Sequence, residues 1–350
     1  MKKLIPVFSG LRERLVTKLL DEGAMKMLFE KAYSHNGWFT AENIRLALEN
    51  IVTMLKQEDL EKWVRNYPKG TEPPSARTIA LILAGNIPLA GFHDLMCVLF
   101  TGNKALIKMS SSDEVMLPWL YELIIEVDPS LKSKISFTES KLENFDAVIA
   151  TGTNNSSRYF EYYFKKYPHV FRKNRNSVAV LTGRENAEQL SLLGRDIFDF
   201  FGLGCRNVSK LYVPYDYNFK LFFEAIHPYA DAVNNKKYGN NYDYHRTILL
   251  MNKTALLDNN FILLKEDPSL QSPISVLHYA YYHSKDTLSR ELEARKNDIQ
   301  CIVSDGSFPV SAIPFGSTQS PRLWDYADGM DTIRFLQNLQ TVKPSNLSLS

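Results

Sequence analysis

From Arg77 onward the sequence alternates short apolar segments with longer segments of helical character, and this alternation limits the possible folds more than any other feature. The segments expected to be strands lie at 78–84, at 104–108, around Ile135, at 146–150 and at 177–181. The segments expected to be helices lie at 92–100, at 112–127 and from Ser156 onward. Apolar strands separated by helices are typical of a parallel sheet covered on both faces. The sequence therefore predicts an α/β fold, in which ligands bind beyond the carboxyl ends of the strands.

The residues before this alternation have a different pattern. Between about Ser9 and Trp63, apolar residues recur at spacings of three and four, which predicts a helical N-terminal region. Four neighbouring residues of this region are expected to face the core, namely Met25, Met27, Leu28 and Phe29. The segment 67–75 contains three prolines and a glycine, so it is expected to be a connector.

Composition excludes several classes of protein. A chain of 350 residues with 45% hydrophobic content can bury a large core, and we expect two domains. The formal net charge of +2 indicates no preference for nucleic acid. There is no CxxC pair and no HExxH motif, so no metal site is expected. Because no apolar run approaches membrane-spanning length and no secretory signal is recognisable, we expect a cytoplasmic protein without a membrane span.

One of the three cysteines stands out as a candidate nucleophile. Their odd number and wide spacing argue against a disulfide framework. Cys97 and Cys301 lie in apolar runs, where a thiol fills core space. Cys205 follows Gly202 and Gly204 and precedes an arginine, so a substrate could approach the backbone and the positive charge would favour the thiolate. The same pattern also fits a buried cysteine in a turn.

The turns that follow the expected strands are rich in small and polar residues. They lie at 84–91, at 108–112 and at 150–157, and the last one opens a helix. Hydroxyls and free N–H groups at a helix start can bind a phosphate, but Thr153 and its neighbours are equally suited to cap the helix. Both interpretations stand on spacing alone. No GxGxxG follows any strand, so the usual dinucleotide fingerprint is missing.

An ordered set of motifs resembles the aldehyde dehydrogenase superfamily. These motifs are Ala84-Gly-Asn-Ile-Pro-Leu, Thr101-Gly-Asn-Lys-Ala-Leu-Ile-Lys, Ala150-Thr-Gly-Thr, Phe201-Gly-Leu-Gly-Cys and Ile313-Pro-Phe-Gly. Within the superfamily, the segments 172–180, 204–210 and 321–332 resemble the LuxC-type acyl-CoA reductases. The resemblance extends over roughly 77–336, and the N-terminal helical region matches only in general character.

The resemblance implies an aldehyde dehydrogenase-like fold with two parallel α/β domains. One is a Rossmann-like domain for a nicotinamide cofactor, and the other is a catalytic domain with a nucleophilic cysteine. The expected limits are 1–73 for the helical N-terminal region, 74–200 for the cofactor-binding domain, 201–336 for the catalytic domain and 337–350 for a tail or oligomerisation strand.

The same resemblance assigns roles to individual residues. Cys205 would take the acyl group from a coenzyme A thioester, and Asn86 would donate its amide to the oxyanion together with the Cys205 backbone N–H. Lys108 would bind the adenosine ribose. The residues implied to hold the cofactor diphosphate are Thr151, Gly152 and Thr153.

Two departures from the superfamily pattern refine the expected chemistry. Hydrolytic relatives carry a glutamate that activates water, whereas the corresponding segment 172–177 contains no carboxylate, which favours reduction of an acyl-thioester over oxidation of an aldehyde. NAD-preferring relatives place a glutamate shortly after the lysine, where this chain has Ser110 and Ser111. A site without that charge could accept a 2′-phosphate beside Lys108, so NADPH is the expected donor and NADH stays possible. A third departure concerns the nicotinamide ribose. Relatives hold it with a glutamate a few residues before a proline, where this chain has Ser269 and Leu270. Glu266 is the residue expected to substitute for that glutamate.

The resulting hypothesis is an NADPH-dependent reduction of a long-chain acyl-CoA to the aldehyde through a Cys205 acyl-thioester, with coenzyme A as leaving group. One alternative is an aldehyde-oxidising dehydrogenase, and another is a cofactor-binding partner subunit with vestigial catalysis. The resemblance also implies a homo-oligomer and an acyl-activating partner enzyme.

Two surface patterns allow more than one interpretation. Basic side chains that form either a solvated surface or a site for coenzyme A phosphates are Lys165, Lys166, Arg172, Lys173 and Arg175. The tyrosine-rich stretches 159–164 and 279–282 are expected to pack inside the protein rather than to line a lipid tunnel.

Overall fold

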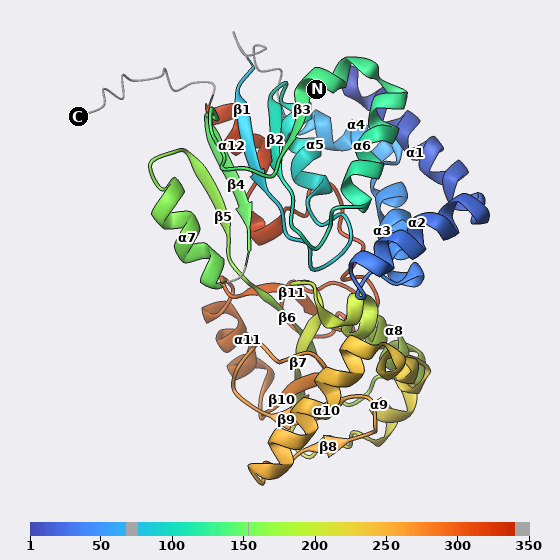
Figure 1. Ribbon diagram of the computed structural model, residues 1–350. Coiled ribbons are helices and arrows are strands. Elements are labelled where there is room, and N and C mark those ends of the chain that lie inside the picture. Colours follow the sequence, from blue (N-terminus) through green and yellow to red (C-terminus); the bar gives the residue numbers. More distant parts are fainter. Residues whose placement is uncertain (68–75, 153, 340–350) are drawn as a thin grey trace. The chain divides into compact units, whose positions relative to one another are not determined.

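The computed structural model describes residues 1–67, 76–152 and 154–339 (Figure 1). The chain forms two compact units. The first contains the described residues up to Lys173 together with those from Pro321 onward, and the second contains Asn174–Ser320. The chain passes from the first unit to the second between Lys173 and Asn174 and returns between Ser320 and Pro321. The sequence analysis ended the cofactor-binding domain at residue 200, and the strand expected at 177–181 pairs within the second unit.

The first unit is built on a five-stranded sheet with the strand order β3-β2-β1-β4-β5, and all its pairs are parallel. The strands are β1 (Thr78–Ile82), β2 (Lys104–Lys108), β3 (Ile135–Thr138), β4 (Ala147–Thr151) and β5 (His169–Arg172). Four of these strands were predicted. The sequence analysis missed β5, which has only four residues and carries polar residues at both ends.

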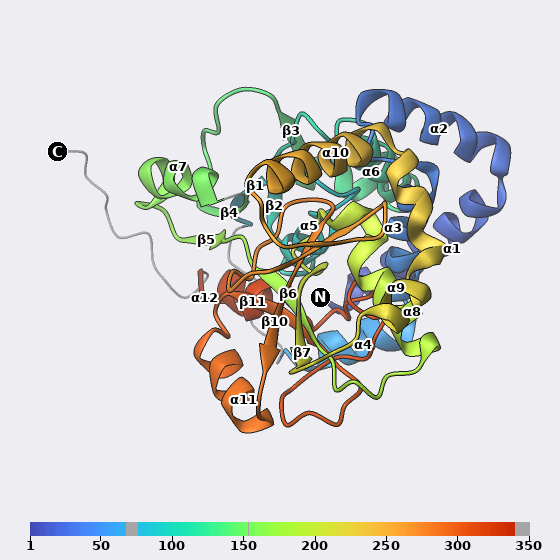
Figure 2. The same ribbon diagram turned by 90° about the horizontal axis from the view of Figure 1, so that it is seen from below.

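Helices cover both faces of this sheet. They are α5 (Phe92–Phe100), α6 (Met116–Val127) and α7 (Asn154–Phe164). Ile79 and Leu81 of β1 belong to the large core that includes α5 and α6, whereas Ala80 packs with Phe160 and Phe164 of α7 on the opposite face. Figures 1 and 2 show α7 on the other side of the sheet from α5 and α6. A doubly covered parallel sheet explains why β1 is apolar at successive positions.

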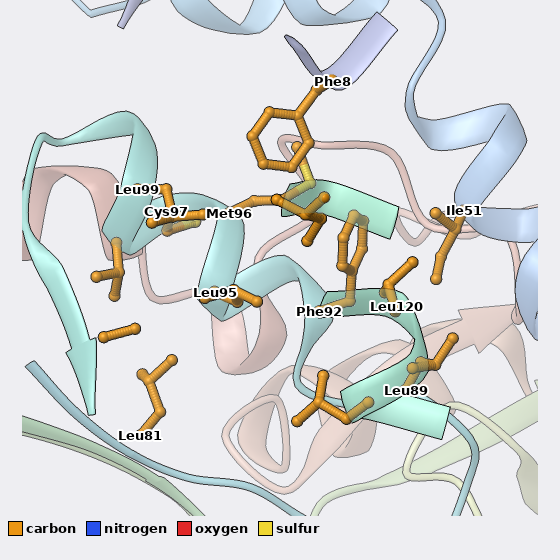
Figure 3. Packing of buried hydrophobic residues seen from close by; sticks show 14 of the residues in the cluster. Phe8, Ile51, Leu81, Leu89, Phe92, Leu95, Met96, Cys97, Leu99 and Leu120 are labelled. Carbon is orange, nitrogen blue, oxygen red and sulfur yellow. The ribbon is translucent and has the colours of Figure 1, made fainter. Parts of the chain in front are cut away.

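The N-terminal helices extend the first unit's core. They are α1 (Ile5–Leu20), α2 (Glu22–His35), α3 (Ala41–Met54) and α4 (Gln57–Arg65), preceded by a 3-10 turn, η1 (Lys2–Leu4). Figure 3 shows Phe8 of α1 and Ile51 of α3 beside Phe92 and Met96 of α5. A fully buried Trp63 donates from Nε1 to the hydroxyl of Tyr326 at 2.7 Å. The segment after Pro321, with η5 (Ala327–Gly329) and α12 (Thr332–Leu339), is thus part of this core.

The predicted core cluster at 25–29 is only partly confirmed. Met25 and Phe29 are buried and Leu28 is partly buried, but Met27 is 74% exposed. In a helix, residues two apart lie on different faces, so Met25 and Met27 cannot both face the same core.

The second unit contains a six-stranded sheet with the order β11-β6-β7-β10-β9-β8. Its strands are β6 (Asn176–Val180), β7 (Val208–Pro214), β8 (Leu257–Asp258), β9 (Leu263–Glu266), β10 (Val276–Tyr282) and β11 (Ile299–Val303). Every pair is parallel except that of the edge strand β8 with β9. Two α/β units with parallel sheets confirm the predicted fold class, and β8 is the one antiparallel addition among the described strands.

Helices also cover this second sheet on both faces. They are α8 (Ala187–Phe198), α9 (Lys220–Ala225), α10 (Lys236–Met251) and α11 (Lys285–Ala294), with the 3-10 turns η3 (Asp199–Gly202) and η4 (His227–Asn234). The first unit has one further 3-10 turn, η2 (Pro129–Lys134). Val180 of β6 packs with Leu288 and Leu292 of α11. Tyr279 of β10 points to the opposite face, where its ring lies 4.9 Å from that of Phe219 at the start of α9.

The structure corrects two expectations about surface residues. Arg172 is neither solvated nor available to coenzyme A, because it is 4% exposed, forms an ion pair with Asp94 and donates to Thr332 Oγ1 at 3.0 Å. An arginine within a basic cluster gave no sequence signal of a buried partner 78 residues earlier in the chain. In contrast to the prediction of interior packing, three tyrosines of α7 are 58% to 76% exposed, namely Tyr159, Tyr162 and Tyr163.

No described helix combines the length and hydropathy needed to cross a membrane.

Candidate active site

The candidate cofactor residues of the first unit follow three neighbouring strands. Ile82 at the end of β1 is paired with Lys108 at the end of β2 and with Ala150 near the end of β4. Because these strands are parallel, the turns that follow them lie at the same edge of the sheet. The described residues that the structure brings to this edge are Asn86, Lys108, Ser110, Ser111, Thr151 and Gly152, and Thr153 lies outside the described residues.

This edge is also the switch point of the sheet. From β1 the chain runs through β2 to β3 on one side and then places β4 on the other side of β1. In open α/β sheets, ligands bind in the crevice outside the carboxyl ends of the strands at such a point. The topology therefore provides a place for a cofactor without a GxGxxG motif.

The turn after β1 packs closely against the serine-rich turn after β2. A Cβ atom on Gly85 would lie 2.5 Å from Ser110 Oγ and 3.0 Å from Ser112 Cβ, so no larger residue fits without displacement. The carbonyl groups of Ser111 and Ser112 accept hydrogen bonds from His35 Nε2 at 2.9 Å and from Asn36 Nδ2 at 3.1 Å. The end of α2 thus holds this turn, a role that the sequence pattern did not reveal.

The other two turns have their own constraints. Lys108 donates from Nζ to the Ser140 carbonyl at 3.3 Å, in the turn that follows β3. A Cβ atom on Gly152 would lie 2.8 Å from Ser156 Cβ and 3.0 Å from a ring carbon of Phe160, so glycine allows α7 to approach the end of β4. Helix capping was the other interpretation of 150–157, and of these residues Thr153 and the side chains of Asn154, Asn155 and Ser157 lie outside the described part.

Cys205 lies in the second unit between η3 and β7, at the amino end of that strand. It is partly exposed, whereas Cys97 and Cys301 are buried, as predicted for structural thiols. Burial raises the pKa of Cys97 well above its usual value. The Cys205 carbonyl accepts a hydrogen bond from Ser177 Oγ at 3.0 Å, which ties the loop to the start of β6. Among the described cysteines, Cys205 alone is not buried.

The backbone before Cys205 takes an uncommon course. Phe200, Phe201 and Gly202 have positive φ values of 54°, 55° and 74°. The left-handed region costs a residue other than glycine roughly 1–3 kcal/mol, and such residues persist where the surrounding structure fixes them. Burial of Phe200, which is 4% exposed, is one contact that fixes this turn.

Asn207 is the main support of the cysteine loop, and the sequence analysis did not single it out. Its Oδ1 accepts a hydrogen bond from Gly204 N at 2.8 Å. Its Nδ2 donates to the carbonyl groups of Asp196 at 3.1 Å and Asp199 at 2.8 Å. The side chain is 2% exposed and so connects the loop with the end of α8 in a buried environment.

A second loop, 316–319, lies along the cysteine loop. The Asp196 carboxylate accepts hydrogen bonds from Gly316 N at 2.7 Å and Thr318 N at 3.0 Å. Arg206 donates from Nε to the Thr318 carbonyl. Burial raises the pKa of Asp196, and the two backbone N–H groups partly offset this effect. Asp196 thus connects α8 with loop 316–319, and Arg206 connects that loop with Cys205.

Asp199, at the start of η3, has a raised pKa. Burial raises its pKa to about 6, although Arg195 acts in the opposite direction from 3.7 Å.

In the part of the chain that the structure describes, no group of three or more His, Cys, Asp and Glu residues could hold a metal ion.

Comparison with known proteins identifies the family. The family model described as acyl-CoA reductase (LuxC) matches residues 12–212, which is more than half of the chain. The chain belongs to the LuxC family. The match includes the Cys205 loop and the three strand-end turns of the first unit, so the predicted family is confirmed.

A reductase of Vibrio harveyi matches a short part of this LuxC-family chain. A long-chain acyl-protein thioester reductase of Vibrio harveyi is 33% identical over 105 residues, which cover 26% of this chain and 20% of the relative. The matched part thus spans about a fifth of that protein's length.

Solved structures show the same fold at low identity. Aldehyde dehydrogenase 21 of Physcomitrella patens, in complex with succinate, has a TM-score of 0.65 and 12% identity, covering 96% of this chain and 84% of that one. An indole-3-acetaldehyde dehydrogenase in complex with NAD+ has a TM-score of 0.62 and 13% identity, covering 86% and 71%. The fold of this chain is therefore the aldehyde dehydrogenase fold.

Proposed function

We propose that this LuxC-family protein reduces a long-chain acyl-CoA to the aldehyde with NADPH, through an acyl-thioester on Cys205. The observation that supports it most is the burial of the three cysteines: Cys205 is partly exposed in a loop held by hydrogen bonds, while Cys97 and Cys301 are buried. An accessible thiol beside glycines and Arg206 suits nucleophilic attack on a thioester.

The chemistry begins with transfer of the acyl group. The Cys205 thiolate attacks the carbonyl carbon, a bond forms between Sγ and that carbon, and the bond to the sulfur of coenzyme A breaks. Coenzyme A leaves as a thiolate and takes up a proton. Negative charge develops on the carbonyl oxygen during attack, and the Asn86 amide and the Cys205 N–H are the donors proposed to stabilise it.

The strand-end turns of the first unit fit a nicotinamide cofactor. Glycine at positions 85 and 152 lets the turns after β1 and β4 pack closely on Ser110 and on α7 at the switch point of the sheet, which is where ligands bind in such folds. Lys108 would bind the adenosine ribose and its 2′-phosphate, and the serines of 110–111 would accept that phosphate without charge repulsion. When bound, NADPH supplies the hydride that reduces the acyl-thioester.

The absence of a water-activating carboxylate supports a reductase. In the segment 172–177, Arg172 is buried against Asp94 and Ser177 donates to the Cys205 carbonyl, so the residues of this segment serve the fold. An acyl-thioester that must survive until reduction is protected when no general base activates water beside it.

A second candidate substrate is a long-chain acyl group carried on a protein thiol, because the Vibrio harveyi relative is described as a long-chain acyl-protein thioester reductase. The chemistry at Cys205 would be the same, and only the leaving thiol would differ. An acyl-activating partner enzyme and a homo-oligomeric, cytoplasmic protein fit both candidates.

The test is a product assay with palmitoyl-CoA and NADPH. We expect aldehyde, free coenzyme A and NADP+ in equal amounts, and no aldehyde from the Cys205→Ala variant. Oxidation of aldehyde to acid without coenzyme A would instead identify an aldehyde-oxidising dehydrogenase. Binding of NADPH without any acylation of Cys205 would identify a subunit with vestigial catalysis.

A further inference from the structure

Gln319 places an amide donor without a partner inside the protein. The residue is 8% exposed, and its Nε2 makes no hydrogen bond to any described residue. Leaving a buried donor unsatisfied costs roughly 1–3 kcal/mol, so an apolar side chain of the same size would be the more stable choice at this position. Such a group calls for an acceptor that the protein alone does not provide.

The position of this amide relates it to the nucleophile. Gln319 Oε1 lies 3.9 Å from the point where a Cβ atom of Gly204 would be. The preceding residue, Thr318, accepts a hydrogen bond from Arg206. Loop 316–319 is therefore hydrogen-bonded to Arg206, which follows Cys205, and the Oε1 side of the Gln319 amide faces Gly204, which precedes it.

The loop that carries Gln319 is held firmly. Its backbone is bound by the buried Asp196 carboxylate at Gly316 and Thr318, and Asp196 is itself connected through its carbonyl to Asn207. A donor on such a support loses little freedom when an acceptor arrives, which is the condition for strong electrostatic stabilisation.

We infer that Gln319 donates from Nε2 to the carbonyl oxygen of the acyl group that reacts with Cys205, which makes it a further catalytic residue. The inference rests on the proposed function. The acyl carbon becomes bonded to Cys205 Sγ, so its oxygen lies close to the cysteine loop, and this oxygen gains negative charge during attack. Gln319 supplies a donor in addition to the proposed Asn86 amide and Cys205 N–H.

The test measures acylation and stability in the same variants. The intact mass of Cys205 acylation by palmitoyl-CoA without NADPH is followed by rapid quench, and Tm is measured in parallel. Gln319→Met removes the donor and keeps the size of the side chain. We expect a loss of roughly 10²-fold in the acylation rate, with Tm unchanged or higher because an unsatisfied polar group is gone.

A second variant adds a pH signature. In Gln319→Glu, only the protonated carboxyl can donate, so the ratio of its acylation rate to that of the wild type should be higher at pH 5.5 than at pH 8. The matched control is Gln189→Met. Gln189 forms the capping box of α8 with Asn186, so this variant should lower Tm and leave acylation unchanged.

Each outcome decides the question. Wild-type acylation by Gln319→Met would overturn the inference and leave the proposed function intact. A lower Tm with acylation at the level of the Gln189→Met control would show that Gln319 is structural, and would also overturn it. If the wild type itself forms no adduct, the proposed function fails and the inference with it.

Discussion

Replacing Asn207 by alanine is the perturbation that best tests the architecture of the cysteine loop. The side chain makes three hydrogen bonds, one from Gly204 N and two to the carbonyl groups of Asp196 and Asp199. The Asn207→Ala variant loses all three. Because Asn207 is 2% exposed, water cannot replace these bonds without a local rearrangement.

The expected magnitude follows from these contacts. A net contribution of about 1 kcal/mol for each hydrogen bond gives a loss of about 3 kcal/mol in the free energy of unfolding. The loop should also shift, and a displacement of about 1 Å of a reacting group can lower a rate by roughly 10²-fold. We therefore expect both lower stability and slower acylation of Cys205.

Stability is best followed by circular dichroism during urea unfolding, because all four tryptophans lie in the other unit, at positions 38, 63, 119 and 324. The control is Asn235→Ala, which removes the N-cap of α10 in the same unit and should cost about 1 kcal/mol without changing acylation. An Asn207→Ala protein with wild-type stability and a wild-type acylation rate would refute this account of the loop.

Three further predictions concern charged residues. The pKa of Asp199, about 6 when folded against 3.8 as the reference, means that the folded state binds this proton more tightly. Wild type should therefore gain about 2–3 kcal/mol over Asp199→Asn in urea titrations as pH falls from 7 to 4, and a constant difference would contradict the raised pKa. Arg172→Met leaves Asp94 as a buried unpaired charge and should cost about 3–5 kcal/mol by tryptophan fluorescence, most of it recovered in a double variant with Asp94→Leu; no recovery would reject the pairing. Lys108→Met should raise KM for NADPH roughly tenfold or more and leave acylation without cofactor unchanged, and an unaltered KM would remove Lys108 from the proposed site.

Elements with strong periodicity could be predicted from the sequence. The strands β1 and β2 and the helix α5 were expected almost at their observed limits, because apolar runs of fixed length in a doubly covered sheet leave a clear signal. The missed strand β5 and the later start of α6, at Met116 instead of Ser112, occur where short polar segments carry little periodicity.

The sequence also indicated which thiol is exposed, because only Cys205 lies among glycines and the other two lie in apolar runs. The supports of its loop could not be predicted in the same way. Loop 316–319 lies more than 100 residues after Asp196 and Asn207 in the chain, and the hydrogen bonds among these residues depend on how α8, β7 and the end of the unit pack. The same reason hid the contacts of His35 and Asn36 with the serine-rich turn.

The buried ion pair between Arg172 and Asp94 was the other feature that the sequence could not predict. Arg172 looks like one member of a basic surface cluster, yet its partner Asp94 comes from α5, 78 residues earlier in the chain. No motif contains both residues, and only the fold brings them together.

The most direct test of the central claim is the intact mass of the protein after incubation with palmitoyl-CoA, beside the Cys205→Ala variant. The account predicts one acyl adduct on the wild type, none on the variant, and loss of the adduct with release of aldehyde when NADPH is added. An adduct that forms equally on Cys205→Ala, or no adduct on the wild type, would contradict the proposal that Cys205 carries the acyl group.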